Sequence, residues 1–265
     1  MQGEQNANCG GPTQLDFYSC ALPALINDWR AKFANPGMPF GVFLLAAWAS
    51  ADLRSFPLLR LLQVATSHAL PAVFTASTLD AGEPNGGPVH SPYKQVPAAR
   101  AAAALRALLY GDAGAAFLGP RATGARAAGL VTDIAFDPAT LYGAPLALAW
   151  GGAACPPKVA APNCESFAVL TSDCVWRSVE AGGGGGAAVS AAAEGGTLTL
   201  SLTGAPAGVY VVATRGYFAN WPLVALRNGA GVPAEPWLLN VTAHSCAMPR
   251  VEPEEWAGEV PGLHA

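Results

Sequence analysis

A histidine in a loop rich in glycine and proline is the strongest chemical signal in the chain. His90 follows Asp80 and Glu83, and the loop itself follows a β-branched and aromatic run at residues 72–79. Such a run is typical of a strand, so the loop is expected at the strand's carboxyl end. Ligands of open α/β sheets bind beyond that edge, where an imidazole near carboxylates can transfer protons. The pattern predicts a general base at His90, although a solvated loop histidine with incidental acids has the same local sequence.

The start of the chain carries a second group of polar residues. Gln2, Gly3 and Glu4 place an amide, a glycine and a carboxylate together before the first expected helix. An amide N–H can donate to an oxyanion, and a glycine lets a backbone approach a substrate closely. The group is therefore a candidate oxyanion and substrate-binding segment, while polar residues at a chain start are more often a solvated terminus.

Alternating helix and strand patterns are expected to position both groups. Apolar residues recur at helical spacing in some segments, and continuous apolar runs suited to buried strands separate them. On the last of these helices, Arg100 and Arg106 are expected to face water. This order predicts a layered α/β domain. Its expected elements are helix 16–34, strand 40–48, helix 56–68, strand 72–79 and helix 93–110.

The composition changes after residue 112. Short runs rich in Val, Leu and Thr, separated by Gly and Pro, are typical of an antiparallel sandwich. The glycine run at 182–186 is expected to be a flexible connection. The chain is thus divided into an α/β part at 1–112, a β-sandwich-like region at 113–245 and a tail at 246–265. The expected strands are 130–136, 146–150, 167–171, 197–203, 209–214 and 237–241.

Composition limits the classes of partner. With 265 residues, of which 52% are hydrophobic and 12% charged, the chain can bury a sizeable core and is not disordered as a whole. No uninterrupted apolar run reaches the roughly 18 residues of a membrane span. A net charge of −4 without a Lys/Arg cluster argues against a nucleic-acid or anionic-membrane surface. A small molecule or glycan is the expected partner.

The cysteines indicate the compartment rather than a metal. Six cysteines without Cys-x-x-Cys spacing argue against a zinc site, and no metal or cofactor is predicted. An oxidising compartment fits better, and the glycosylation triplet Asn240-Val241-Thr242 agrees with it. Because the chain opens with Met1-Gln2 and no signal peptide, either it is cytosolic or its N-terminal part is missing. In the second case the full-length protein is expected to be secreted or to lie in the lysosomal or endomembrane lumen.

Several segments match one family in the right order. They are Gln2-Gly3-Glu4, Phe56-Pro57-Leu58-Leu59-Arg60 with Gln63, His90 to Gln95, Cys174-Val175-Trp176, Arg215 to Pro222 and Pro233 to Pro236. Together they resemble the sialate O-acetylesterase family, within the hydrolases named for Ser, Gly, Asn and His blocks. The resemblance covers nearly the whole chain, and it implies that the α/β part is a partial three-layer α/β/α hydrolase domain.

The resemblance implies an esterase of the Ser-His-Asp type that removes O-acetyl groups from sialic acids or related sugars. By position, His90 would be the general base and Gln2 an oxyanion donor, while Glu4 would order the loop around Gly3. The acid that orients His90 is open, because Asp80 matches an aspartate of the family and Glu83 is the reserve candidate.

Three departures from the family pattern bear on activity. Gly87 stands where many relatives have an aspartate, and Ser91 replaces a proline. Met1 stands where the family has an aromatic residue. The Gly-rich block that carries the family's nucleophile does not occur, and Ser91 is the one tempting substitute. We therefore expect the C-terminal part of an esterase, inactive alone, with the missing upstream part as a partner.

Two other functions stay open. In a carbohydrate-binding or accessory protein, Trp176, Trp221 and Trp237 would stack on sugar rings, although these rings could equally fill the core. The chain could also be an inactive partial gene product.

The resemblance also implies a disulfide. The family has a cysteine pair before its Cys-x-Trp segment, and Cys164 and Cys174 lie close in sequence, so these two are expected to pair. Cys9 with Cys20 is a second expected pairing.

Overall fold

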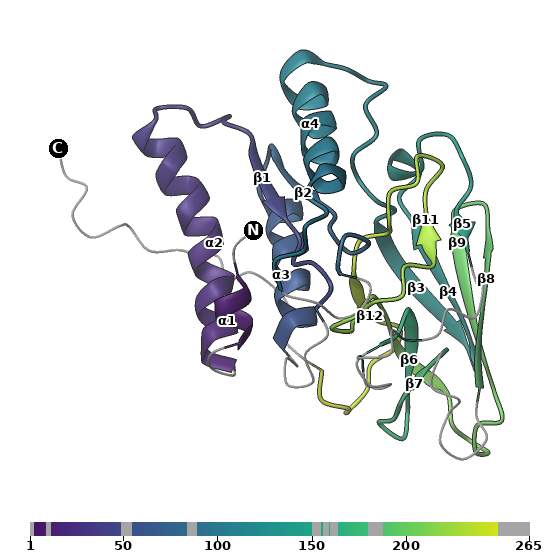
Figure 1. The fold of residues 1–265 in the computed structure, drawn as a ribbon. Helices are drawn as coiled ribbons and strands as arrows, with labels where there is room; N and C mark the ends of the chain where they lie inside the picture. The colour runs from purple at the N-terminus through teal and green to yellow at the C-terminus, as the bar shows by residue number, and fades with distance from the viewer. Residues whose placement is uncertain are drawn as a thin grey trace.

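A computed structural model describes residues 3–8, 12–48, 55–83, 89–149, 155, 159, 164–179 and 188–248 (Figure 1). The helices are α1 (Glu4–Asn8), α2 (Pro12–Lys32), α3 (Ser55–Ala69), α4 (Gln95–Tyr110) and the short 3-10 helix η1 (Pro138–Leu141). The strands are β1 (Phe40–Phe43), β2 (Val73–Ala76), β3 (Ala122–Ala128), β4 (Val131–Phe136), β5 (Ala147–Leu148), β6 (Phe167–Thr171), β7 (Trp176–Ser178), β8 (Ala188–Glu194), β9 (Thr197–Thr203), β10 (Val211–Gly216), β11 (Leu226–Arg227) and β12 (Trp237–Asn240).

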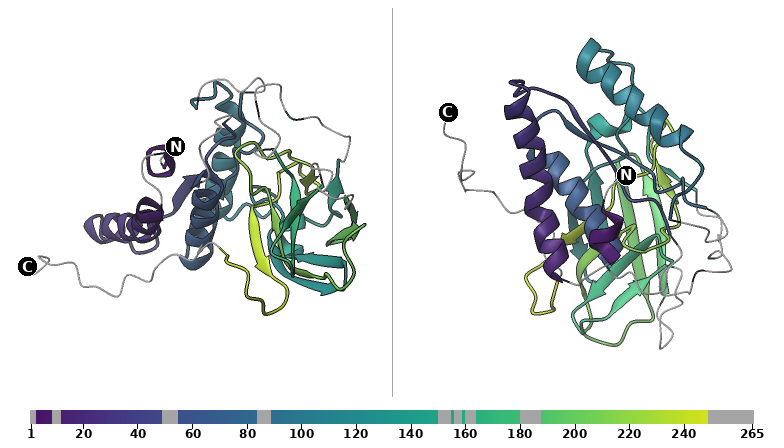
Figure 2. Two further views of the ribbon diagram at one scale, coloured as in Figure 1. Left: turned by 90° about the horizontal axis from the view of Figure 1, so that it is seen from below. Right: turned by 60° about the vertical axis from the view of Figure 1, so that its left-hand side comes forward.

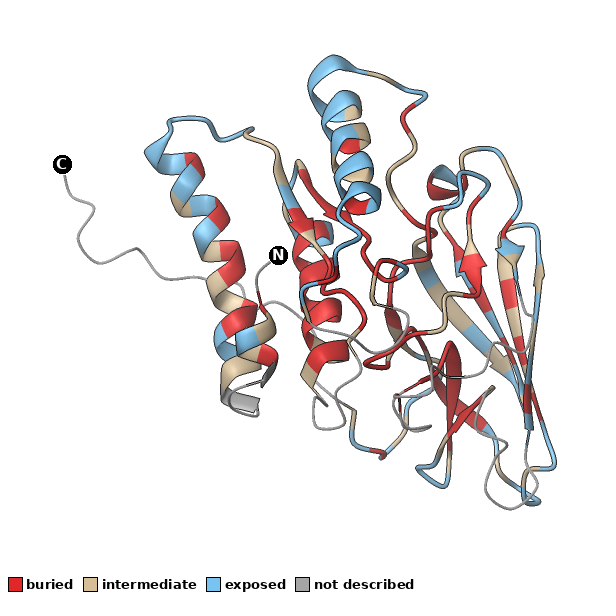
Figure 3. Ribbon diagram, in the orientation of Figure 1, coloured by how far each residue is buried: buried red, intermediate tan, exposed pale blue. Residues whose placement is uncertain are grey.

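The first part of the chain forms the predicted layered α/β structure. Strands β1 and β2 pair in parallel, and helices α3 and α4 both pack against β2. Val73 joins an apolar cluster with residues of α2 and α3, whereas Phe74 meets the ring of Phe117 beyond α4. All four residues of β2 are buried because both faces are covered, which agrees with its place in a β-branched and aromatic run (Figure 3).

Strand β1 is shorter than the run at 40–48 predicts, although the residues beyond it stay buried. The Leu44 N–H still donates to the Ala76 carbonyl of β2 at 3.1 Å, but from Leu45 onward the backbone bonds to side chains of α3 instead. Gln63 donates from Nε2 to the Phe43 carbonyl at 3.2 Å and accepts from the Leu45 N–H at 3.1 Å. Arg60 donates from Nε to the Leu45 carbonyl at 2.8 Å. Buried peptide groups need partners, and these two side chains provide them where the ladder stops.

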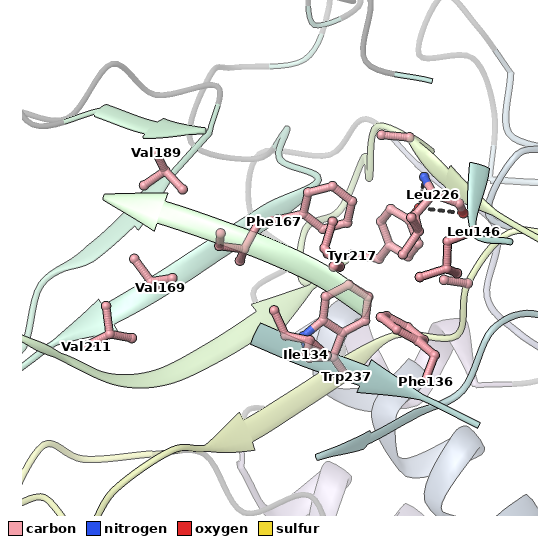
Figure 4. Close-up of a cluster of buried hydrophobic side chains, with 14 of the residues drawn as sticks. Ile134, Phe136, Leu146, Phe167, Val169, Val189, Val211, Tyr217, Leu226 and Trp237 are labelled. Atoms are coloured by element: carbon pink, nitrogen blue, oxygen red, sulfur yellow. Dashed lines mark hydrogen bonds between the residues drawn. The ribbon is translucent and has the colours of Figure 1, made fainter. Parts of the chain in front are cut away.

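The second part is a sandwich of two four-stranded antiparallel sheets, with orders β12-β10-β6-β7 and β3-β4-β9-β8. Apolar residues of both sheets meet in one core (Figure 4). In that core the Trp237 ring stacks on Phe167 at 5.6 Å and meets Phe136 edge-on at 5.5 Å between centroids. The α/β part followed by this β-rich region confirms the predicted fold class.

Four strands of this region, β3, β7, β8 and β11, were not predicted from the sequence. Strand β8 lies in the alanine-rich flank of the glycine run at 182–186, and its alanines carry little β signal. It forms because it pairs in antiparallel fashion with β9, whose alternating Leu198, Leu200 and Leu202 are buried in the core. The glycine run itself lies outside the described residues.

The α/β part and the β-rich part lie side by side (Figure 2), and the buried carboxylate of Glu235 joins them. Glu235, from the β-rich part, accepts from Thr75 Oγ1 in β2 at 2.9 Å and contacts His68 Nε2 in α3 at the same distance. Arg121 Nε lies 3.3 Å from the same carboxylate. Burial alone would raise the pKa of Glu235, but His68 and Arg121 hold that pKa below its ordinary value. The domain boundary at residue 112 stays a prediction, and this contact shows that the flanking parts pack closely.

The predicted disulfide between Cys164 and Cys174 is wrong. Cys164 pairs with Cys155, and Cys174 pairs with Cys246. Cys164 precedes β6 and Cys174 follows it, so a five-residue strand, about 17 Å long, separates them. Cys20 forms no disulfide with any described residue. Its predicted partner, Cys9, lies outside the described residues.

The two disulfides are expected to differ in their effect on stability. The Cys174–Cys246 bond joins residues 72 positions apart, and the Cys155–Cys164 bond joins residues 9 apart. In the chain-entropy description, the longer loop gives a stabilisation of about 4 kcal/mol and the shorter about 3 kcal/mol. Urea unfolding of the two double Cys→Ser variants measures this. A larger loss for the short loop would contradict the prediction.

No helix among the described residues has the length and apolar character that crossing a membrane requires.

Candidate functional site

The loop that carries His90 leaves the carboxyl end of β2 and is fastened to the end of β1. Thr78 Oγ1 donates to the Leu44 carbonyl, and the Ala81 N–H donates to the Thr78 carbonyl at 3.0 Å. Gly82 lies so close to the backbone after β1 that a Cβ on it would stand 2.7 Å from the Ala47 carbonyl oxygen. Only a glycine fits there without moving the loop.

A cavity of about 260 Å³ opens beside this loop. One side is the loop itself and the other is a segment of the β-rich part that follows β10. The lining residues are Leu79, Asp80, Gly82, Trp221, Pro222, Leu223 and Val224. The cavity is mostly apolar, has one carboxylate at its wall and is of a size for a small ligand. It lies at the carboxyl edge of the parallel strands, where α/β folds bind ligands.

His90 itself is exposed and makes no hydrogen bond to any other described residue. The residue before it, Val89, packs against the apolar cluster that contains Ala7 of α1 and Leu59 of α3. Residues 84–88, between Glu83 and Val89, lie outside the described residues. The histidine is thus anchored on its N-terminal side by Val89 and is accessible at its ring.

The start of the chain packs on the same apolar cluster. Gly3 is buried with φ +128°, and a Cβ on it would stand 2.8 Å from Leu59 Cδ2. Glu4 is the first residue of α1, and Gln2 lies outside the described residues. Since Leu59 lies near the start of α3, which follows β1, Gly3 also lies toward the carboxyl edge of the strands. The two sequence-predicted segments therefore share one cluster at one edge of the sheet.

Asp80 is engaged by two arginines. Its carboxylate accepts from Arg100 Nη1 at 2.6 Å and Nη2 at 2.8 Å, and from Arg227 Nη1 at 2.9 Å. Burial alone would raise the pKa of Asp80, but these hydrogen bonds outweigh burial and hold the pKa below its ordinary value. No contact between Asp80 and His90 is present among the described residues. The geometry makes Asp80 an anchor between α4 and the β-rich part.

The expectation that Arg100 faces water is wrong, because its side chain is only 11% exposed. It also donates to the Ser77 carbonyl at 2.8 Å, just beyond β2. The signal was available in the helical spacing, since Arg100 lies on the same face of α4 as the buried Pro97 and Ala104. Arg227 was not predicted as a site residue, since nothing in the sequence near β11 indicates an ion pair across the fold.

Replacing Asp80 by asparagine is expected to lower the free energy of unfolding at pH 7 by about 1.5–3 kcal/mol, since a charge-assisted network of hydrogen bonds is lost. A carboxylate with a lowered pKa stabilises the fold above its unfolded pKa of about 3.9, and this contribution disappears as the pH falls through the lower folded value. The cost of Asp80→Asn should therefore shrink below about pH 4.

The matched control for this variant is Asp112→Asn, because Asp112 pairs with a single exposed arginine on the surface. Urea unfolding at several pH values compares the two variants. Equal stabilities of Asp80→Asn and the wild type at pH 7 would contradict the anchoring role.

The two remaining candidate site residues, Glu83 and Ser91, differ in whether their side chains are already hydrogen-bonded. Glu83 is half-buried and has no hydrogen bond or ion pair with any described residue. Ser91 is buried, and its Oγ accepts from the Tyr93 N–H at 3.2 Å, which is the geometry of a turn. Ser91 is thus used in the loop structure, and the described geometry gives no support to it as a substitute nucleophile.

No family model matches the chain. Curated proteins do match part of it. Over 135 residues it is 33% identical to the sialate O-acetylesterases of Homo sapiens and Pongo abelii. Over 136 residues it is 32% identical to that of Mus musculus. The resemblance to sialate O-acetylesterases is confirmed. The similar region is 45% of this chain but only about a quarter of those proteins, 25% of the human one and 24% of the mouse one.

A solved structure is similar over more of the chain. The carbohydrate acetylesterase from Xanthomonas citri aligns with a TM-score of 0.70 and 26% identity, covering 89% of this chain and 48% of that chain. The chain therefore spans about a quarter of the sialate O-acetylesterases and about half of the bacterial acetylesterase.

Proposed function

We propose that this chain is the histidine-bearing part of a carbohydrate O-acetylesterase, which removes acetyl groups from sialic acids or related sugars. The observation that carries the proposal is the 33% identity to sialate O-acetylesterases. The accessible His90 at the carboxyl edge of the strands supports it, as does the cavity of about 260 Å³ beside its loop. In this proposal His90 is the general base, and Gln2 is an oxyanion donor on the segment that Gly3 and Glu4 hold in place.

The chemistry is acyl transfer. A serine hydroxyl attacks the acetyl carbonyl carbon while His90 removes the hydroxyl proton, and His90 returns that proton to the sugar oxygen as the C–O bond breaks. Water then releases acetate from the acyl-enzyme by the same proton transfers in reverse. A carboxylate orients the histidine, and between Asp80 and Glu83 we propose Glu83, because two arginines already bind Asp80.

The serine is proposed to come from an upstream part of the protein, and the structure offers a place for it. Among the described residues, β1 pairs only with β2. The Phe40 and Leu44 N–H groups point to β2, so in a regular ladder the peptide groups of the exposed Gly41 point away from it. An unpaired edge of this kind is a template for a further strand.

A groove beside that edge is apolar. It has a volume of about 300 Å³ and lies between α2 and β1. Helix α2 also exposes large apolar side chains, in contrast to the buried α3 (Figure 3). They are Phe17, Leu25 and Trp29, and Phe33 just after the helix is exposed as well. An apolar strand of the upstream part would pair with β1 and cover this surface, which agrees with the chain being about half of the bacterial acetylesterase.

The compartment proposed for the full-length protein is extracellular or the lumen of lysosomes or endomembranes. Two disulfides within the β-rich part support it, because such bonds persist in oxidising compartments.

A carbohydrate-binding function without catalysis is the alternative, and the tryptophans do not favour it. Trp237 and Trp221 are buried in apolar clusters. Trp176 is half-buried, and the Arg215 guanidinium lies 4.1 Å from its ring centroid. None of the three offers a fully open ring to a sugar.

Acetate release separates these functions. The longer protein that includes the upstream part should release acetate from O-acetylated sialic acid, measured by a coupled acetate assay. Binding of a labelled O-acetylated sialoside without any acetate release would overturn the esterase proposal and support the binding function.

A further inference from the structure

The triplet Asn240-Val241-Thr242 has no part in the proposed esterase chemistry. It is the only Asn-x-Ser/Thr triplet in the 265 residues, and the middle residue is not proline. Asn240 is the last residue of β12, and β12 is an edge strand of its sheet. Both Asn240 and Thr242 are exposed. The segment that follows lies at the lower rim of the molecule, in yellow (Figure 1).

The side-chain amide of Asn240 is hydrogen-bonded through its oxygen to His244. His244 Nε2 lies 3.0 Å from Asn240 Oδ1, so the imidazole donates to the amide oxygen. The amide nitrogen Nδ2 has no partner among the described residues. The segment that carries His244 is fixed in turn by the disulfide from Cys246 to Cys174. Glycans attach at Nδ2 and leave Oδ1 free to accept, so the bond from His244 is compatible with a glycan at Asn240.

We propose that Asn240 is an N-glycosylation site of this protein. The donor class is a lipid-linked oligosaccharide diphosphate. A bond forms between Asn240 Nδ2 and the anomeric carbon of the first sugar, and the bond from that carbon to the diphosphate oxygen breaks. The leaving diphosphate keeps the electron pair and Nδ2 loses one proton, so no oxidant or reductant is needed. The hydroxyl of Thr242 is the second element that the acceptor triplet requires.

A glycan at this place has a physical consequence. In its sheet β12 pairs only with β10, with Asn240 opposite Ala213, so the other edge of β12 is unpaired among the described residues. Unpaired edges are sites of aggregation, and a bulky hydrated group at the end of the strand blocks pairing with another chain. This inference rests on the triplet, its exposure and the disulfides, and is independent of the esterase proposal.

The test is translation of the chain, behind a cleavable secretory signal, in the presence of eukaryotic microsomes. A single band shift that peptide:N-glycosidase removes is expected, with Asn240 converted to aspartate at the released site. Asn240→Gln and Thr242→Ala should both abolish the shift. Thr242→Ser is the matched control, because it keeps the hydroxyl, and it should retain the shift.

Translocated wild-type chain without the shift would overturn the proposal, and so would a shift that persists in Asn240→Gln. Attachment to the nascent chain precedes folding, so a folding defect in a variant does not obscure the result. As a second measurement, urea unfolding of the unmodified Asn240→Gln chain should match that of the unmodified wild type, which separates loss of the glycan from loss of the fold.

Discussion

Arg60→Met is expected to lower the free energy of unfolding by about 3–5 kcal/mol, because several buried carbonyls lose their hydrogen-bond donor at once. Arg60 is 0% exposed, and its guanidinium donates to four carbonyls, two after β1 and two in the β-rich part. The bonds to Leu45, Ala46, Ala219 and Asn220 measure 2.8, 3.1, 2.5 and 3.1 Å. Without the guanidinium, buried carbonyls lose their donors, and each costs about 1–3 kcal/mol.

Arg60 keeps its positive charge although it is buried. Desolvation lowers the pKa of Arg60 to about 9, so the side chain is still protonated at neutral pH. Lysine carries all its N–H donors on one nitrogen and cannot reach four carbonyls as the planar guanidinium does. Arg60→Lys should therefore lose most of the same stability.

Urea unfolding measures both Arg60 variants. Arg106→Met is the control, since Arg106 is an exposed arginine on α4 and should change stability little. A loss below about 1 kcal/mol for Arg60→Met would contradict its role as the buried link between the two parts.

His90→Ala is expected to reduce kcat for acetyl-ester hydrolysis by about 100-fold or more in the longer protein that includes the upstream part. The reason is that no other described imidazole is placed at this loop, and general-base assistance is lost with the ring. His244→Ala is the control, because His244 lies after β12 on the β-rich part and should leave kcat unchanged.

Two further variants identify the acid that orients His90. Glu83→Gln should lower kcat with little effect on stability, whereas Asp80→Asn should act mainly on stability. A His90→Ala protein with a near-normal kcat would remove His90 from the mechanism.

The helices and the main strands could be predicted from the sequence because their patterns are local. The apolar residues at helical spacing in α2 and the β-branched and aromatic run that contains β2 each indicate one element. The alternation at Thr197–Thr203 predicts β9 with its bounds. Strand β8 could not be found in this way, because its partner β9, rather than its own alanines, makes it a strand.

The errors concern contacts that depend on the whole fold. The disulfide partners of Cys164 and Cys174 are set by which ends of β6 the two residues occupy, and sequence separation carries no such information. One of the two arginine partners of Asp80, Arg227, likewise comes from β11, far along the chain. At the site, the sequence could indicate that His90 follows the carboxyl end of a strand, but the position of Gly3 at the same edge and the ion pairs that engage Asp80 appear only in three dimensions.

We propose that this chain supplies the base of an acetylesterase and that another segment supplies its nucleophile. The direct measurement is hydrolysis of 4-nitrophenyl acetate and of O-acetylated sialic acid by the purified 265-residue chain, with His90→Ala in parallel. We expect the wild-type chain and His90→Ala both to match the buffer rate, because an imidazole without an activated hydroxyl within reach cannot carry out acyl transfer. Turnover clearly above buffer that disappears in His90→Ala would contradict it, since a hydroxyl within these residues would then be the nucleophile.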